Sequence, residues 1–413
     1  MTALWRNREF TLLWTSQSLS DLGTGVASLA FSLLVLVETG SAVRAGLVGT
    51  LSMVARLVIR LPGGVLVDRC DRRRVMVVCD SLRLAAFAVL TLAVFSGQVG
   101  LPLILVVTLI DSSAGAVFGA AEDAALRSIV PIEQVPAAVA RNEARSYGTS
   151  LAGPPLGGFL FGLGHAVPFL SNAISYLVSV VAVLRIRKPL QGEREEQSQP
   201  YGAALAEGIG FVFAHPFLRA LLLIAAPLNF AIGGVLFTVV VALQQNGTPP
   251  AVIGLTETIV AVGGLLGAVA APALQSRLSV PSLVRGICWA AAVLVAGSAL
   301  LISNIGAAVP LGLAVFLGPA CTAALFGYQA AVTPDRLQGR VISIVMVAAT
   351  SMAALAPVVG GVLLSSSSPS TAVLVFAASV VVSALTATFS TGIRGVEEID
   401  LPGPVIPPAG VAE

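Results

Sequence analysis

Twelve long apolar runs divide this 413-residue sequence, and they limit what it can fold into more than any other feature. A bilayer core takes about 20 apolar helical residues to cross. The runs fall near residues 11–37, 45–67, 75–96, 101–122, 144–164, 168–185, 217–243, 251–274, 283–303, 307–329, 340–364 and 370–391. Because 56% of the residues are hydrophobic and only 11% are charged, a soluble domain is excluded. The sequence therefore predicts an all-α membrane protein with twelve transmembrane helices.

The basic residues alternate along these runs. The connectors after runs 1, 3, 5, 7, 9 and 11 contain almost no charge, whereas the other connectors and both termini hold nearly every arginine. Of the 23 lysine and arginine residues, Arg44 alone belongs to a connector of the first kind. Arginine-rich short loops stay on the cytoplasmic side of a membrane. We therefore expect a multi-pass protein with both termini in the cytoplasm.

The most densely charged connector joins runs 2 and 3. It reads Gly64-Val-Leu-Val-Asp68-Arg69-Cys-Asp71-Arg72-Arg73-Arg74. Each of these charges would cost roughly 2.5–3.5 kcal/mol in hydrocarbon, so the connector must lie in water. Gly64 is expected to permit close contact between helices. Asp68 is expected to accept hydrogen bonds from an arginine or from the N-terminus of a neighbouring helix.

The spacing of proline and glycine indicates an internal repeat. Pro131, Pro154, Gly157 and Gly158 form one set of prolines and glycines. The same residues at the same intervals recur 203 positions later, at Pro334, Pro357, Gly360 and Gly361. The constant offset predicts two six-helix bundles, a plan that is common among transporters. The same offset would send Gly64 to Gly267 and Asp68 to Ala271. On this alignment the second copy has lost its aspartate and most of its arginines.

Hydrophilic stretches mark the predicted domain boundaries. Arg185–Gln199 separates the halves, and apolar residues at helical spacing in Leu205–Phe213 indicate a short helix on the inner membrane surface, unless they merely begin run 7. The acidic, proline-rich end of the chain favours disorder. We predict an N-terminal six-helix bundle at 1–184, a cytoplasmic central loop with the surface helix at 185–215, a C-terminal six-helix bundle at 216–392 and a disordered cytoplasmic tail at 393–413.

The order G-x-L-x-D-R-x-x-R-R-R in the charged connector resembles the loop 2–3 signature of the major facilitator superfamily. The resemblance implies the major facilitator fold and a cytoplasmic latch between helices. The latch residues would be Gly64, Asp68, Arg69, Arg72, Arg73 and Arg74. Asp71 departs from the pattern, because the family often has glycine there. The alternative is an ordinary basic loop that only sets the topology.

Run 5 carries a second motif, G-P-x-x-G-G, which resembles the antiporter signature of the same superfamily. Its residues are Gly148, Gly153, Pro154, Gly157 and Gly158. Proline kinks a helix and glycine admits a close neighbour, so a packing kink without directional meaning is the alternative. Asn142-Glu143-Ala-Arg145-Ser before it, with Asp80 and Arg83 in run 3, resembles the bacterial branch that contains the enterobactin exporter and macrolide-efflux proteins. That resemblance implies an exporter in the bacterial cytoplasmic (inner) membrane.

Charged residues within membrane spans are costly and usually functional. The candidates for coupling or substrate binding are Asp21, Arg56, Arg60, Asp111, Glu122, Asp123 and Glu257. Burial favours a protonated carboxyl, so we expect Asp21 or Asp111 to exchange a proton, with Arg56 or Arg60 as the balancing charge. The alternatives are a static ion pair or, for Arg60, a side chain that extends to the inner surface. Many related exporters carry an arginine in span 4, where this chain has Asp111-Ser-Ser-Ala-Gly115.

We expect a proton-coupled exporter of a small amphipathic compound of the drug, antibiotic or siderophore type, working by alternating access. Its predicted partners are a small-molecule substrate, protons and the lipid bilayer, and we expect a monomer. The sequence has no phosphate-binding loop, nucleophile–base arrangement or metal-ligand spacing, which predicts no enzyme activity, no cofactor and no metal. Scattered basic residues do not indicate a nucleic acid partner. The alternatives are an importer or lipid flippase of the same fold, or a non-transporting membrane sensor or scaffold.

Overall fold

The computed structural model describes residues 4–188, 190 and 201–396, and within them the regular structure is entirely helical. The first half has six long helices, α1 (Arg8–Thr39), α2 (Ala42–Arg69), α3 (Arg72–Phe95), α4 (Leu101–Ile129), α5 (Val135–Leu163) and α6 (Val167–Arg185). The second half has six more, α8 (Pro216–Gln245), α9 (Pro250–Gln275), α10 (Val280–Ser298), α11 (Ala308–Val332), α12 (Gln338–Ser366) and α13 (Pro369–Phe389). Two shorter helices are α7 (Tyr201–Ala214) and α14 (Thr391–Arg394).

These twelve long helices match the twelve predicted runs, so the predicted fold class is confirmed. Among the described residues, eleven helices are long and apolar enough to cross a membrane. The remaining long helix, α5, contains Arg141, Glu143 and Arg145 in its first half. It begins at Val135 rather than near 144. Hydropathy marks only the apolar part of a helix, and therefore missed the polar turns with which α5 begins.

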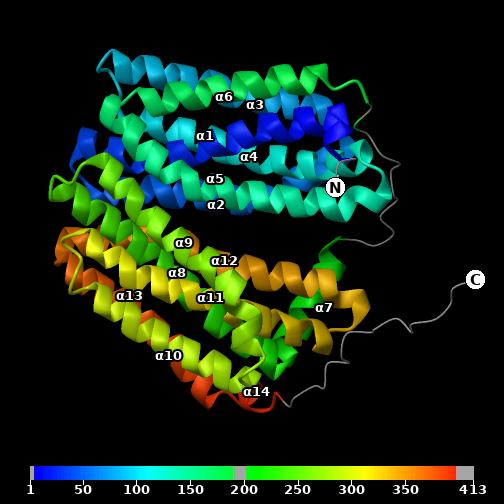
Figure 1. Ribbon diagram of the computed structural model, residues 1–413, viewed down its shortest axis with the longest axis vertical. Helices are drawn as coiled ribbons and strands as arrows, with labels where there is room; N and C mark the ends of the chain where they lie inside the picture. Colours follow the sequence, from blue (N-terminus) through cyan, green and yellow to red (C-terminus); the bar gives the residue numbers. More distant parts are fainter. Residues whose placement is uncertain (1–3, 189, 191–200, 397–413) are drawn as a thin grey trace, which may run out of the picture.

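The helices form two bundles, α1–α6 and α8–α13 (Figure 1). Between the bundles, α2 packs on α12 and α5 packs on α9. Figure 1 shows α7 and the start of α1 at one end of the molecule. We call this end the termini side and the other end the opposite side.

Glycines bring α2 and α12 into backbone contact towards the opposite side. A Cβ atom at Gly46 would collide with the carbonyl oxygen of Pro357, and one at Gly361 would lie 2.5 Å from the carbonyl oxygen of Ala42. One hydrogen bond also crosses this interface, from the Val358 backbone N–H to Thr50 Oγ1 at 3.1 Å. Side chains at these glycines would therefore force the two bundles apart.

The α5–α9 interface repeats this arrangement. Cβ atoms at Gly158 and Gly254 would collide with the carbonyl oxygens of Pro250 and Pro154. Thr258 Oγ1 donates a hydrogen bond to the carbonyl of Leu151 at 3.4 Å. The opposite side is thus closed by two equivalent backbone contacts, one on each flank of the bundle interface.

The internal repeat is present, but it has two registers. A 3₁₀ turn at Ile132–Gln134 leads into α5, and another at Asp335–Leu337 leads into α12, 203 positions later. In the first helices of each half the offset is 208, because Gly46 corresponds to Gly254 and Thr50 to Thr258. The change of register falls where α3 has 24 residues and α10 has 19.

The 208-residue offset corrects the alignment of the charged connector. Asp71 and Ser279 occupy the N-cap positions of α3 and α10, 208 positions apart. Asp68 therefore corresponds to Ser276 and not to Ala271, and Arg69 corresponds to Arg277. The predicted loss of the aspartate and of most arginines from the second copy holds in this register as well.

The central segment forms a separate helix, α7, which does not merely begin the seventh long helix, because His215 is extended between α7 and α8. Val212 of α7 is fully buried, and α7 packs on α12. Glu207 pairs with Arg336 and with Arg340 Nη1, the latter at 2.7 Å. The hydrogen bond from Arg336 lowers the pKa of Glu207. Within the predicted loop of 185–215, residues 189 and 191–200 lie outside the described residues.

The short helix α14 ends the described chain. Ile393 is fully buried and Val396 is nearly so. The first residues of the predicted tail thus pack against the second bundle. Residues 397–413, for which we predict disorder, lie outside the described part.

Candidate functional site

A cavity of about 330 Å³ lies between the two bundles. The first bundle lines it with residues of α1, α2 and α4, and the second with residues of α8, α9 and α12. Phe31, Phe237 and Val240 give it apolar walls, and Ser28 and Ser52 are among its hydroxyl groups. A cavity of this size, with mostly apolar walls and a few polar groups, is typical of a small-molecule site.

Three of the predicted charged residues line this central cavity. They are Arg56 on α2, Asp111 on α4 and Glu257 on α9. Arg60 is exposed one turn further along α2. The fold therefore brings together residues that are far apart in the sequence, and one of them comes from the second bundle.

Asp111 belongs to a buried polar network. Arg83 Nε donates a hydrogen bond to Asp111 Oδ1 at 2.9 Å, and the hydroxyl of Tyr176 donates to the same oxygen at 2.8 Å. Arg83 also donates to Thr24 Oγ1 at 3.2 Å and pairs with Asp80 at 3.4 Å. The exposed fractions of Asp80, Arg83 and Asp111 are 0%, 6% and 6%. This network ties α1, α3, α4 and α6 together beside the central cavity.

A second ion cluster joins α1, α4 and α5. Arg145 lies 2.9 Å from a carboxylate oxygen of Asp21 and 2.8 Å from one of Glu122. The Glu122 side chain is 9% exposed, whereas that of Asp21 is 37% exposed. Asp123 is exposed beside Glu122. The cluster therefore has one carboxylate that reaches the solvent and one that does not.

The balancing arginines differ from the expected ones. The structure pairs Asp111 with Arg83 and Asp21 with Arg145, and not with Arg56 or Arg60. In the sequence, only the resemblance to a family pattern marks Arg83 and Arg145. Arg83 lies eleven residues into an apolar helix, and that position alone was a signal of function.

The charged connector is shorter than the sequence indicated, because α2 continues to Arg69 and α3 begins at Arg72. Asp71 caps α3 by accepting a hydrogen bond from the Arg74 backbone N–H at 2.9 Å. Asp68 is exposed, and no described residue is hydrogen-bonded or ion-paired to it. The helix-capping role that we expected of Asp68 thus belongs to Asp71.

Two arginines of the connector donate hydrogen bonds to backbone carbonyls of α4 and of the segment that follows α6. Arg72 donates to the carbonyls of Ala124 and Leu190 at 3.2 and 3.0 Å, and Arg73 donates to the carbonyl of Lys188 at 2.8 Å. The expected close contact at Gly64 is wrong, because a Cβ atom there would meet nothing within 4 Å. A Cβ atom at the adjacent Gly63 would lie 3.1 Å from Val117 Cγ2.

Three glycines of the motif in α5 lie too close to neighbouring backbone to carry a side chain. Cβ atoms at Gly153 and Gly157 would lie 2.8 Å from the backbone of Gly25 and 2.5 Å from the carbonyl oxygen of Val26, both on α1. Gly158 faces α9 instead, and around Gly148 there is open space. The motif therefore lets α5 pack closely on α1 and α9 at the same time.

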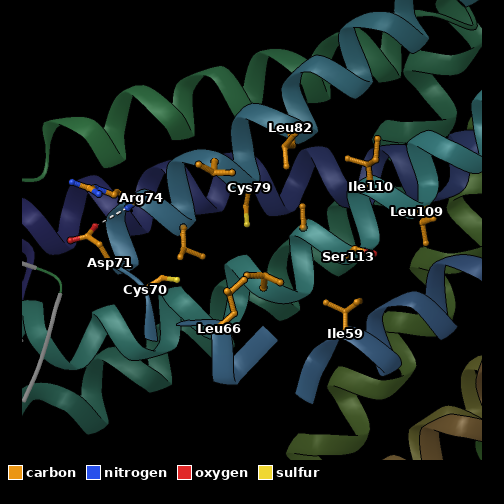
Figure 2. Close-up of a pocket in the computed structure, with 14 residues that line it drawn as sticks. Ile59, Leu66, Cys70, Asp71, Arg74, Cys79, Leu82, Leu109, Ile110 and Ser113 are labelled. Atoms are coloured by element: carbon orange, nitrogen blue, oxygen red, sulfur yellow. Dashed lines mark hydrogen bonds between the residues drawn. The ribbon is translucent and has the colours of Figure 1, made fainter. Parts of the chain in front are cut away.

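A second cavity, of about 750 Å³, lies among α2, α3 and α4 (Figure 2). Leu66, Leu82 and Ile110 contribute to its apolar wall, and Asp71 and Arg74 lie at one end. Ile59 of α2 and Ser113 of α4 also line it. We call it the lateral cavity. It is confined to the first bundle and does not touch the second.

The comparisons with known proteins agree with this architecture. The family model described as transmembrane secretion effector matches residues 2–407. The chain belongs to the major facilitator superfamily. Macrolide efflux protein A of Streptococcus pyogenes is 25% identical over 267 residues, which cover 64% of this chain and 65% of that protein. The multidrug efflux pump Tap of Mycobacterium tuberculosis is 29% identical over 306 residues, or 71% of each chain.

Solved structures of the superfamily share the fold. A bacterial homologue of the human lysosomal transporter Spinster, in an inward-facing and unoccupied conformation, gives a TM-score of 0.72 at 15% identity and covers 95% of this chain and 98% of that one. A bacterial homologue of the iron transporter ferroportin gives 0.72 at 16% identity in its inward-facing state, covering 92% and 98%. A bacterial homologue of ferroportin in the outward-facing state gives a TM-score of 0.57 at 18% identity, also covering 92% of this chain and 98% of that one.

Proposed function

We propose that this major facilitator protein is a proton-coupled exporter of small amphipathic organic compounds, that it works by alternating access, and that it acts as a monomer without enzymatic activity. The central cavity is the observation that carries the proposal. Both bundles line it, so that a rocking motion of one bundle against the other exposes the same site to either side. The efflux functions named for Streptococcus pyogenes macrolide efflux protein A and Mycobacterium tuberculosis Tap support export.

We assign the structure to the inward-facing state, with both termini in the cytoplasm of a bacterium. The contacts at Gly46, Gly158, Gly254 and Gly361 support closure of the opposite side. The higher TM-score with the inward-facing ferroportin homologue, 0.72 against 0.57, is consistent with that assignment. The arginine-rich connectors support the orientation. The exposed Asp68 then represents the open form of the cytoplasmic latch.

We place the transported proton on the cluster of Asp21, Glu122 and Arg145. Two carboxylates share one guanidinium there, so the cluster carries one excess negative charge that a proton neutralises. The partly exposed Asp21 gives the proton a route to water. Asp111 has the same two-to-one arrangement with Asp80 and Arg83, but it also lines the cavity, and we therefore expect it to respond to substrate.

Transport by inverted membrane vesicles tests the proposal. With an inwardly acidic gradient, vesicles that contain the protein should accumulate amphipathic fluorescent dyes, and dissipation of the gradient should release them. Asp21→Asn should abolish the dependence on the gradient at an unchanged protein level. Accumulation by right-side-out vesicles instead would mean import. No gradient-dependent movement in either preparation would refute proton-coupled transport.

The orientation has its own test. In a background without the native cysteines, Ser365→Cys lies on the opposite side and Ser276→Cys lies on the termini side, and both serines are exposed. A membrane-impermeant thiol reagent added to intact cells should label the first and not the second. The reverse pattern would invert the topology and, with it, the assigned direction of transport.

A further inference from the structure

Three polar groups in the central cavity have no bonding partner among the residues that the structure describes. Arg56 and Glu257 form no ion pair or hydrogen bond with each other or with any other described residue. Thr108, which is 3% exposed, has a hydroxyl oxygen without a hydrogen-bond partner. Asp111 in the same wall is fully engaged with Arg83 and Tyr176. Within one cavity, some polar side chains are therefore fully bonded and others have no partner among the described residues.

The two unpaired charges are opposite and come from opposite bundles. Arg56 lies on α2 of the first bundle and Glu257 on α9 of the second. Glu257 is partly buried, whereas Arg56 is exposed and open to a ligand in the cavity. A carboxylate drawn out of water without a partner is costly, and a structure keeps such a group where a ligand supplies the partner. A purely cationic ligand would satisfy Glu257 but leave Arg56 unpaired, and a purely anionic ligand would do the reverse.

We propose that the preferred substrates are zwitterions, with an acidic group that binds Arg56, a basic group that binds Glu257 and an apolar body that packs on Phe31 and Phe237. Thr108 adds a hydrogen bond. This inference rests on the proposed export function and names its substrate class. Because the two charged contacts lie on different bundles, a zwitterion also links the bundles while it is bound.

Three ligands that share the same apolar body but differ in charge test whether zwitterions are the preferred substrates. They are a coumarin-bearing α-amino acid, which is zwitterionic, its methyl ester, which is cationic, and its N-acetyl derivative, which is anionic. Binding is followed by fluorescence anisotropy with the full-length protein in lipid nanodiscs. The zwitterion should bind at least tenfold more tightly than either derivative. Equal affinities for the three would overturn the inference.

Single substitutions then assign each charge. Glu257→Gln should weaken binding of the zwitterion and the cation by about tenfold and leave the anion unchanged. Arg56→Gln should weaken the zwitterion and the anion and leave the cation unchanged. A merely structural role, or an ion pair formed between the two residues in another state, would change all three affinities together and would also overturn the inference.

The failure of this inference is distinguishable from failure of the proposed function. If no compound of the three binds, the zwitterion site is refuted. If inverted vesicles with the same protein still accumulate amphipathic dyes in response to a proton gradient, the export function stands without it. If neither ligand binding nor gradient-dependent dye accumulation is observed, the zwitterion site and the export function are both refuted.

Discussion

The two bundles share one plan but pack their second helices differently. In the second bundle, Gly263 and Gly267 of α9 bring its backbone against Gly312 and Phe316 of α11. In the 208-residue register, Ile59 stands where the second bundle has Gly267, and Ile59 lines the lateral cavity between α2 and α4. The same helix pair is thus closed where it has glycine and leaves a cavity of about 750 Å³ where it has isoleucine.

The bundles also differ in charge. In the 203-residue register, Asp111, Glu122 and Arg145 correspond to Ala314, Leu325 and Ala348. Ala314 and Leu325 are buried in an apolar core. The first bundle has therefore specialised for charge, whereas the second forms a tightly packed partner that contributes Glu257 to the cavity. The two halves thus share the order of their long helices but not the chemistry of their buried faces.

The largest expected effect concerns the charged bundle. Arg83→Met leaves Asp80 and Asp111 buried without their cation, and removal of one partner from such a cluster costs about 3–5 kcal/mol. We expect a marked loss of thermal stability in purified protein. The matched control adds Asp80→Asn and Asp111→Asn to Arg83→Met, and it should recover most of the stability without recovering transport. Parental stability of the single variant would contradict a charge-dependent first bundle.

The next effect concerns the tightly packed bundle. Gly267→Val places side-chain atoms against the backbone of Phe316, and overpacking of this kind costs about 1–3 kcal/mol. The control is Gly119→Val in α4, where a Cβ atom meets nothing within 4 Å. Thermal unfolding followed by size-exclusion chromatography should show a loss for the first variant only. Equal thermal stability of the two variants would contradict the proposed difference in packing.

A third prediction tests whether the charged connector acts as a latch in the first half only. If Asp68 accepts hydrogen bonds when the termini side is closed, as the proposed latch requires, Asp68→Asn removes bonds worth roughly 1.5–3 kcal/mol each from that state. We expect efflux at matched protein levels to fall about tenfold, with folding intact. Ser276→Ala, at the corresponding position of the second half, should leave efflux unchanged. Equal activities of both variants and the parent would leave the connector as a topology signal alone.

The smallest effect concerns α7. The pKa of Glu207 is lowered in the folded protein, so its contacts with Arg336 and Arg340 contribute above the ordinary glutamate pKa of about 4.3 and are lost as the pH falls below it. In a background without the native cysteines, Val212→Cys should become slightly more reactive to thiol reagents below that pH. With Glu207→Gln the reactivity should not change with pH. If the thiol reactivity at low pH rises equally with and without Glu207→Gln, a group other than Glu207 causes the rise.

Hydropathy predicted most ends of the twelve long helices to within a few residues, because bilayer crossing acts on the local sequence. It missed the start of α5 and the end of α4, where polar turns extend the helices beyond their apolar parts. Pairings between helices were not predictable in this way. Arg83 and Asp111 are 28 positions apart and Arg145 and Asp21 are 124 apart, so only packing reveals them as partners. The 203-residue offset was correct for α5 and α12, and wrong for α2 and α9, because the shorter α10 shifts the register.

The backbone seal on the opposite side has a kinetic consequence. Among the described residues, the α2–α12 and α5–α9 interfaces hold glycine–carbonyl contacts and two hydrogen bonds but no ion pair. The rate at which this seal opens should therefore be nearly independent of ionic strength. The termini side contains most of the arginines, so the rate at which it closes should change with ionic strength. The opening of the opposite side and the closure of the termini side would then be distinguishable by how their rates depend on salt concentration.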